Sequence, residues 1–169
     1  KLNEKDKIAL VSHGGDLDGL ASAKIVDAVI KADFLKFIDY EDINEELILF
    51  LKKKQITKVI FTDLNFTNFE IIRTIERFAS ILILDHHRFY QDMNSAKTTF
   101  IIAKGVCASY LCYYLFSKVQ NLEKFDWLVV CASLSDWAFL ENQEFMRKIY
   151  EKYKEHFFSE ERKLQQSQF

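Results

Sequence analysis

Residues 58–87, KVIFTDLNFTNFEIIRTIERFASILILDHH, contain two apolar runs separated by a helical pattern. The runs 58–62 and 81–84 are short and apolar, which predicts two buried strands. Between them, over 67–78, isoleucine and phenylalanine recur at the spacing of one helix face. A strand, a helix and a second strand in this order predict a right-handed crossover connection, and therefore two parallel strands in one sheet.

The same alternation extends in both directions along the chain. Further strands are predicted over 8–11, 34–38 and 99–103, and further helices over 19–31, 44–54, 106–119 and 125–134. Strands that are apolar on both sides fit a sheet covered on both faces. The sequence therefore predicts an α/β fold with a doubly wound, mainly parallel five-stranded sheet and helices on both faces.

The last part of the chain has a different character. Over residues 141–169 there is no strand signal, and apolar residues recur every four positions. This pattern is typical of one long helix with a single apolar face. We therefore divide the chain into a domain over residues 1–140 and a linker-like helical tail over 141–169, which packs on the domain or leads to a second one.

Bulk composition limits the classes of function. A chain of 169 residues is long enough for one domain with a sizeable core. Its net charge of −2 gives no overall field that would attract nucleic acid. The longest uncharged run is too short to span a bilayer, so no membrane partner is expected. The three cysteines have no CxxC spacing and predict reduced thiols in a cytoplasmic protein.

Ligand-type side chains follow three of the predicted strands. In sheets of this kind, ligands bind beyond the carboxyl ends of the strands. The residues concerned are His13, Asp16 and Asp18 after the first strand, Asp63 after the third, and Asp85, His86 and His87 after the fourth. Carboxylate and imidazole ligands together suit Mn²⁺, Zn²⁺ or Fe²⁺ better than Ca²⁺. The sequence therefore predicts one divided metal site.

Several of these residues also have simpler explanations. Asp16 or Asp18 would serve as the N-cap of the following helix, and a lone acid such as Asp63 is often a turn residue. Asp136, at the end of an apolar helix, is weak evidence by itself, although small residues precede it.

Three more residues are candidates for substrate binding. Arg88 is either a phosphate contact or an ordinary exposed arginine. Gly105 and Ser109 lie at the start of a predicted helix, where free backbone N–H groups could receive an anion.

Taken together, four segments resemble the DHH phosphoesterase superfamily, and in particular its RecJ-like catalytic domain. In order, they are Asp16-Leu17-Asp18-Gly19, Asp63, Asp85-His86-His87 and Asp136. The resemblance implies two divalent metal ions, most often Mn²⁺. It implies that His13 and Asp16 hold the first ion, that Asp63 bridges both, and that Asp18, His86 and Asp136 hold the second. It further implies that Asp85 orients His86 and that His87 faces the scissile phosphate.

The function implied by this resemblance is metal-dependent hydrolysis of phosphodiester bonds in single-stranded or short nucleic acid. Two alternatives stay open: hydrolysis of pyrophosphate, nucleotides or cyclic dinucleotides, and a non-catalytic replication scaffold of the same fold. The pattern departs from the family at His13, which precedes Asp16 by three residues where many members have four. Most members also carry a second domain with basic groups for the substrate, so we expect such a domain, or a partner protein, after the tail helix.

Overall fold

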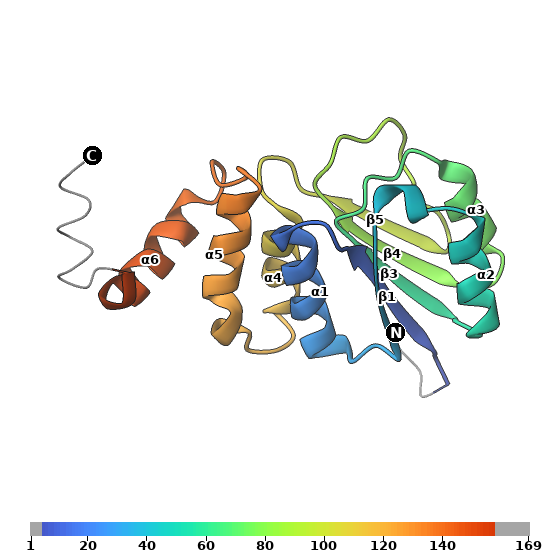
Figure 1. The fold of residues 1–169 in the computed structure, drawn as a ribbon, viewed down its shortest axis with the longest axis horizontal. Coiled ribbons are helices and arrows are strands. Elements are labelled where there is room, and N and C mark those ends of the chain that lie inside the picture. The colour runs from blue at the N-terminus through green and yellow to red at the C-terminus, as the bar shows by residue number, and fades with distance from the viewer. Residues whose placement is uncertain (1–4, 158–169) are drawn as a thin grey trace.

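The computed structural model describes residues 5–157, with side chains up to residue 155. It contains one sheet of five strands in the order β2-β1-β3-β4-β5, and every neighbouring pair is parallel (Figure 1). The strands are β1 (Ile8–His13), β2 (Phe34–Ile38), β3 (Lys58–Thr62), β4 (Ser80–Asp85) and β5 (Thr98–Ile102). The helices are α1 (Leu17–Ile30), α2 (Glu45–Lys53), α3 (Phe69–Glu76), α4 (Ala108–Phe116), α5 (Asp126–Ser135) and α6 (Gln143–Phe157), with short 3-10 turns at Tyr40–Asp42 and Glu123–Phe125. The doubly wound α/β fold is confirmed.

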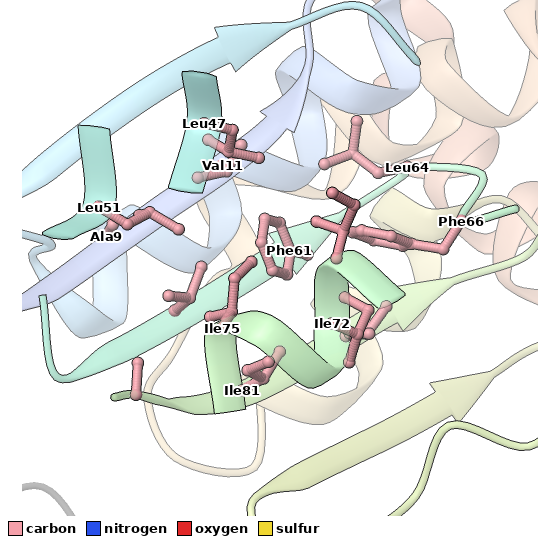
Figure 2. Packing of buried hydrophobic residues seen from close by; sticks show 14 of the residues in the cluster. Ala9, Val11, Leu47, Leu51, Phe61, Leu64, Phe66, Ile72, Ile75 and Ile81 are labelled. Atoms are coloured by element: carbon pink, nitrogen blue, oxygen red, sulfur yellow. The ribbon is translucent and has the colours of Figure 1, made fainter. Parts of the chain in front are cut away.

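Two apolar clusters hold the layers together. Helices α2 and α3 cover one face of the sheet, where Val11, Phe61 and Ile81 meet Leu47 and Ile75 (Figure 2). Helices α1 and α4 cover the other face, and α5 packs on α1 and α4 on the side away from the sheet. Residues of all three helices pack in one cluster with alternate residues of the same strands. Because successive side chains of a strand point to opposite faces, each central strand supplies both clusters. This explains why the strands are apolar throughout.

Strand β1 continues two residues beyond the predicted apolar run, through Ser12 and His13. Ser12 is fully buried, yet its hydroxyl is satisfied, because it donates to the carbonyl oxygen of Gly19 at 2.7 Å. The hydroxyl of Thr62 on β3 donates in turn to that of Ser12 at 2.7 Å. A buried polar side chain with hydrogen-bond partners carries little penalty, so the strand extends until His13 reaches the edge of the sheet.

Helix α6 packs on the rest of the domain through residues between 145 and 153. Phe145 lies edge-on to Tyr110, at 5.2 Å between ring centroids, and Ile149 is buried. The buried carboxylate of Asp126 accepts hydrogen bonds from the Lys152 ammonium at 2.7 Å and the Tyr153 hydroxyl at 2.9 Å. The predicted apolar stripe is thus the face that meets α4 and α5. Residues 158–169 of the predicted tail lie outside the described part, and a linker role stays a prediction.

Two predictions made from the composition concern membrane-spanning helices and the state of the cysteines. No helix in the described part of the chain is both long and apolar enough to cross a bilayer. Cys107, Cys112 and Cys131 are unpaired thiols, and the first two are buried. Burial raises the pKa of the Cys107 thiol to about 12, with a further contribution from the nearby charge of Asp18. This thiol therefore stays protonated and unreactive at neutral pH.

Gly19 allows α1 to approach β1. A Cβ atom at this position would lie 2.2 Å from the carbonyl oxygen of His13, a backbone atom that no rotamer change can move. We predict that Gly19→Ala destabilises the protein by about 1–3 kcal/mol through overpacking, although alanine gains about 1 kcal/mol in helix propensity. Urea denaturation would measure the change. Lys24→Ala, at an exposed position of the same helix, is the control and should change the free energy of unfolding by less than about 0.5 kcal/mol.

Candidate metal centre

The predicted ligand residues meet at the carboxyl edge of the sheet. His13 is the last residue of β1, Asp63 directly follows β3, and His86 directly follows β4. Asp136 reaches the same place from the end of α5. Because all five strands are parallel, the strand ends lie at one edge of the sheet, and α5 brings Asp136 to the same edge although 123 residues separate it from His13.

The imidazole of His86 lies at the middle of this group. Its Nε2 is 3.3 Å from Oδ1 of Asp63, 3.6 Å from Oδ2 of Asp136 and 3.8 Å from Oδ2 of Asp18. Potential ligand atoms of Asp18, His86 and Asp136 all lie within 4.8 Å of one another. A second such group consists of Asp63, Asp85, His86 and His87, and the two groups share His86. Carboxylates from three separate segments thus lie within 3.8 Å of one imidazole nitrogen, and mixed nitrogen and oxygen donors of this kind suit a transition-metal ion.

Several polar atoms of this group are buried without a hydrogen-bond partner. They are both carboxylate oxygens of Asp63, Nε2 of His86, Oδ2 of Asp136 and Nδ1 of His13. Proteins pair nearly all buried polar atoms, and each exception costs about 1–3 kcal/mol. Such a concentration of buried carboxylate oxygens and imidazole nitrogens without hydrogen bonds fits a bound cation, which these atoms would coordinate.

The electrostatics of the centre agree with this. Burial, together with the charges of Asp18 and Asp16, raises the pKa of Asp63 to about 6, although His86 opposes the shift. Burial by itself would lower the pKa of His86, but Asp63, Asp18 and Asp136 raise it to about 9. Burial also raises the pKa of Asp136. The carboxylates repel one another, because too little positive charge lies near them. A divalent ion would supply the missing positive charge.

The backbone holds Asp63 in an unfavourable conformation. Its φ is +57°, in the left-handed region, which aspartate tolerates better than most residues. Trp137, directly after Asp136, also has a positive φ of 55°. Strained backbone of this kind persists where the surroundings fix it, and it concentrates at functional sites.

Asp16 and Asp18 both cap helices, but not the same one. Asp16 is the N-cap of α1, and its Oδ1 accepts from the amide of Gly19 at 2.9 Å. Its other oxygen lies 3.6 Å from Nε2 of His13, so capping leaves one oxygen facing the centre. Asp18 caps α4 instead: its oxygens accept from the amides of Ala108 at 2.7 Å and Ser109 at 2.8 Å.

The contact between Asp18 and α4 occupies the place where an anion was predicted to bind, at the start of this helix. The anion that the helix start receives is the carboxylate of Asp18, which belongs to the protein itself. Ser109 is fully buried, and its amide is already used. Gly105 remains exposed, with a φ of +78°, and lies beside Arg88 in a pocket next to the centre. Of the three predicted substrate contacts, the structure brings Arg88 and Gly105 to this pocket, while Ser109 is turned into the core.

The role expected for Asp85 needs correction. Its Oδ1 lies 2.8 Å from Nδ1 of His87, while its contact with His86 is only to the backbone amide, at 2.7 Å. Asp85 therefore orients His87 and not the ring of His86, which turns toward Asp63. Burial by itself would lower the pKa of His87, but Asp85 raises it.

Sequence reasoning missed Asp39 and Tyr40. The ring of Tyr40 stacks on that of His13, with 4.4 Å between centroids and 8° between planes, and its hydroxyl lies 3.3 Å from Nε2 of His87. Asp39 Oδ1 is 4.0 Å from Nδ1 of His13. Since β2 ends at Ile38 on the same sheet edge, the rule applied to the other strands would have found Asp39. Tyr40 depends on the following 3-10 turn, which has no clear sequence signal.

Comparison with known proteins identifies a similar fold but no activity. No protein-family model and no curated protein matches the sequence. Among solved structures, the chain is similar to CDC45 from Entamoeba histolytica, with a TM-score of 0.69 and 12% sequence identity. The match covers 89% of this chain and 35% of the CDC45 chain, so this sequence spans about a third of that protein's length. At this identity the likeness shows the fold alone.

Proposed function

We propose that this chain is the catalytic domain of a DHH-type, metal-dependent phosphoesterase that hydrolyses phosphodiester bonds in single-stranded or short nucleic acid. One observation carries the proposal: unpartnered buried ligand atoms from β1, β3, β4 and α5 gather at one edge of the sheet. A purely structural cluster would pair these atoms with each other or with backbone groups.

The ligands divide into two groups that share Asp63. His13, Asp16 and Asp63 would hold one ion, and Asp18, His86 and Asp136, with Asp63, would hold the other. Ligand atoms of Asp18, His86 and Asp136 lie within 4.8 Å of one another, and Asp63 lies 3.3 Å from His86. Divalent ions at these ligands, Mn²⁺ by the family resemblance, would polarise a phosphoryl oxygen and lower the pKa of a water molecule.

His87 has the position of a proton donor. Asp85 fixes its Nδ1, which leaves Nε2 as the atom that faces outward, beside the Tyr40 hydroxyl. Burial and the charge of Asp63 raise the pKa of Tyr40, so this phenol stays protonated and can donate to Nε2 of a neutral His87. A protonated His87 would instead donate from Nε2 to a phosphate oxygen or a leaving group.

A second candidate is a non-catalytic scaffold of the same fold, and the likeness to CDC45 favours it. A scaffold has no need of buried, mutually repelling carboxylates, which lower the stability of the folded state. This chain keeps every acid of the four motifs. We therefore place the scaffold second.

Metal binding separates the two candidates. We expect Mn²⁺ to stabilise the folded protein, because the ion removes the repulsion between the carboxylates. At an Mn²⁺ concentration of 100 times Kd the gain is about 2.7 kcal/mol, which raises Tm by about 5–10 °C in a protein of this size. Differential scanning fluorimetry with and without Mn²⁺ would measure it.

The same protein would then be tested for Mn²⁺-dependent hydrolysis of single-stranded oligonucleotides, dinucleotides, cyclic dinucleotides and pyrophosphate. Cleavage of pyrophosphate alone would favour the alternative hydrolase. A protein that gains no stability from Mn²⁺ and cleaves none of the four substrates would be the scaffold.

A further inference from the structure

A second feature adjoins the metal centre. A pocket of about 500 Å³ opens beside it, a size in the usual range of small-molecule sites. Its lining consists of His86, His87, Arg88, Phe89, Tyr90, Lys104 and Gly105. The two histidines therefore form a wall shared by the centre and the pocket, so a ligand in the pocket would be adjacent to the candidate metals.

The pocket has a charge opposite to that of the centre. Among the described residues, the only charged side chains in its lining apart from the histidines are Arg88 and Lys104, and both are exposed and basic. The centre itself is formed mainly by carboxylates. A basic wall beside an acidic centre suits a ligand whose phosphate reaches toward cations held by those carboxylates.

Two aromatic side chains complete the lining. Phe89 lies edge-on to Phe100 of β5, with 5.5 Å between centroids, so the hydrophobic core fixes its position. The ammonium of Lys104 lies 5.7 Å from the centroid of the Phe89 ring. Tyr90 follows directly and is 84% exposed, which leaves its ring faces accessible from the pocket side. Aromatic rings beside basic groups are the combination that binds single-stranded nucleotides.

We infer that this pocket is a nucleobase subsite. Tyr90 stacks on the base of one nucleotide of the substrate, and Arg88 and Lys104 contact the phosphate of that nucleotide. This inference rests on the proposed function, because the ligand is the substrate of the metal centre. It also narrows that function: pyrophosphate has no ring for Tyr90 to contact, so the pocket selects a base-bearing phosphoester.

The test is a comparison of adenosine monophosphate with ribose 5-phosphate, which lacks the base. Their Kd values would be measured by ligand-observed NMR in EDTA, so that the result does not depend on metal binding. We expect adenosine monophosphate to bind at least about 5-fold more tightly, from the usual strength of base–aromatic stacking. Tyr90→Ala should remove that difference, whereas Lys104→Gln should weaken both ligands equally.

Tyr114→Ala is the control, because Tyr114 is a half-exposed tyrosine of α4 that does not line the pocket. It should leave both Kd values unchanged. Adenosine monophosphate that binds no more tightly than ribose 5-phosphate, or a preference that Tyr90→Ala retains, would overturn the subsite. Neither result bears on Mn²⁺ stabilisation or hydrolysis, so failure of the subsite and failure of the proposed function remain distinguishable.

Discussion

Asp63→Asn is expected to lower the rate of phosphodiester hydrolysis by at least about 10³-fold while the protein stays folded. Both oxygens of Asp63 are buried and have no hydrogen-bond partner in the described part of the chain. The imidazole of His86, 3.3 Å away, belongs to the same centre, so the charge of Asp63 contributes to the centre more than to the fold. Asparagine has the same shape and also tolerates the positive φ at this position. Initial rates on a single-stranded oligonucleotide in Mn²⁺, with circular dichroism to verify folding, would measure the effect.

A double substitution tests whether the acids act as one unit. If Asp63 and Asp136 hold the same ions, Asp63→Asn combined with Asp136→Asn should be hardly slower than either variant alone, since each already disables the centre. Rate losses that multiply would argue against shared ions. The matched control is Asp92→Asn, which changes an exposed acid of the loop after β4 and should retain full activity.

Asp18→Ala is expected to destabilise the metal-free protein by about 2–5 kcal/mol. The substitution leaves the buried amides of Ala108 and Ser109 without an acceptor, and each such group costs about 1–3 kcal/mol. Part of the loss is offset because the repulsion between Asp18 and Asp63 disappears. Urea denaturation in EDTA would measure the free energy of unfolding without any contribution from metal.

Asp136→Ala provides the contrast. It removes a carboxylate from the same centre, but Oδ2 of Asp136 accepts no hydrogen bond in the described part of the chain and has only a 3.6 Å ion pair with His86, so the metal-free protein should lose little stability. Asp18→Asn, which retains one acceptor oxygen, should lie between the two. Equal stability of the Asp18→Ala and Asp136→Ala proteins would mean that Asp18 does not support α4 as the structure indicates.

These two expectations separate roles that the sequence could not distinguish. In the motif pattern, Asp18, Asp63 and Asp136 are equivalent acids that follow a strand or a helix. In the described part of the chain, the carboxylate of Asp63 has no hydrogen-bond partner and only histidines of the centre beside it, whereas Asp18 holds the start of a helix 90 residues away. A carboxylate with two amide partners contributes to folding even without metal, and one with none does not.

The alternation of short apolar runs with helical patterns predicted the five strands and the first five helices to within a few residues, and the apolar stripe after residue 141 predicted the start of α6. It succeeded because burial on both faces of a parallel sheet requires an apolar residue at nearly every position of a strand, as in Ile81–Leu84. The order of the strand ends also predicted that His13, Asp63 and His86 would meet, because parallel strands present their carboxyl ends at one edge.

The sequence by itself therefore determined the fold and the edge where the polar residues gather. Only the tertiary structure decided which of them contact one another: that Asp18 caps α4, that Asp85 orients His87, and that Tyr40 lies over His13. Local patterns report the period and the ends of a segment. The contacts between loops depend on strand order and on the direction of each side chain, which are fixed only when distant segments pack together.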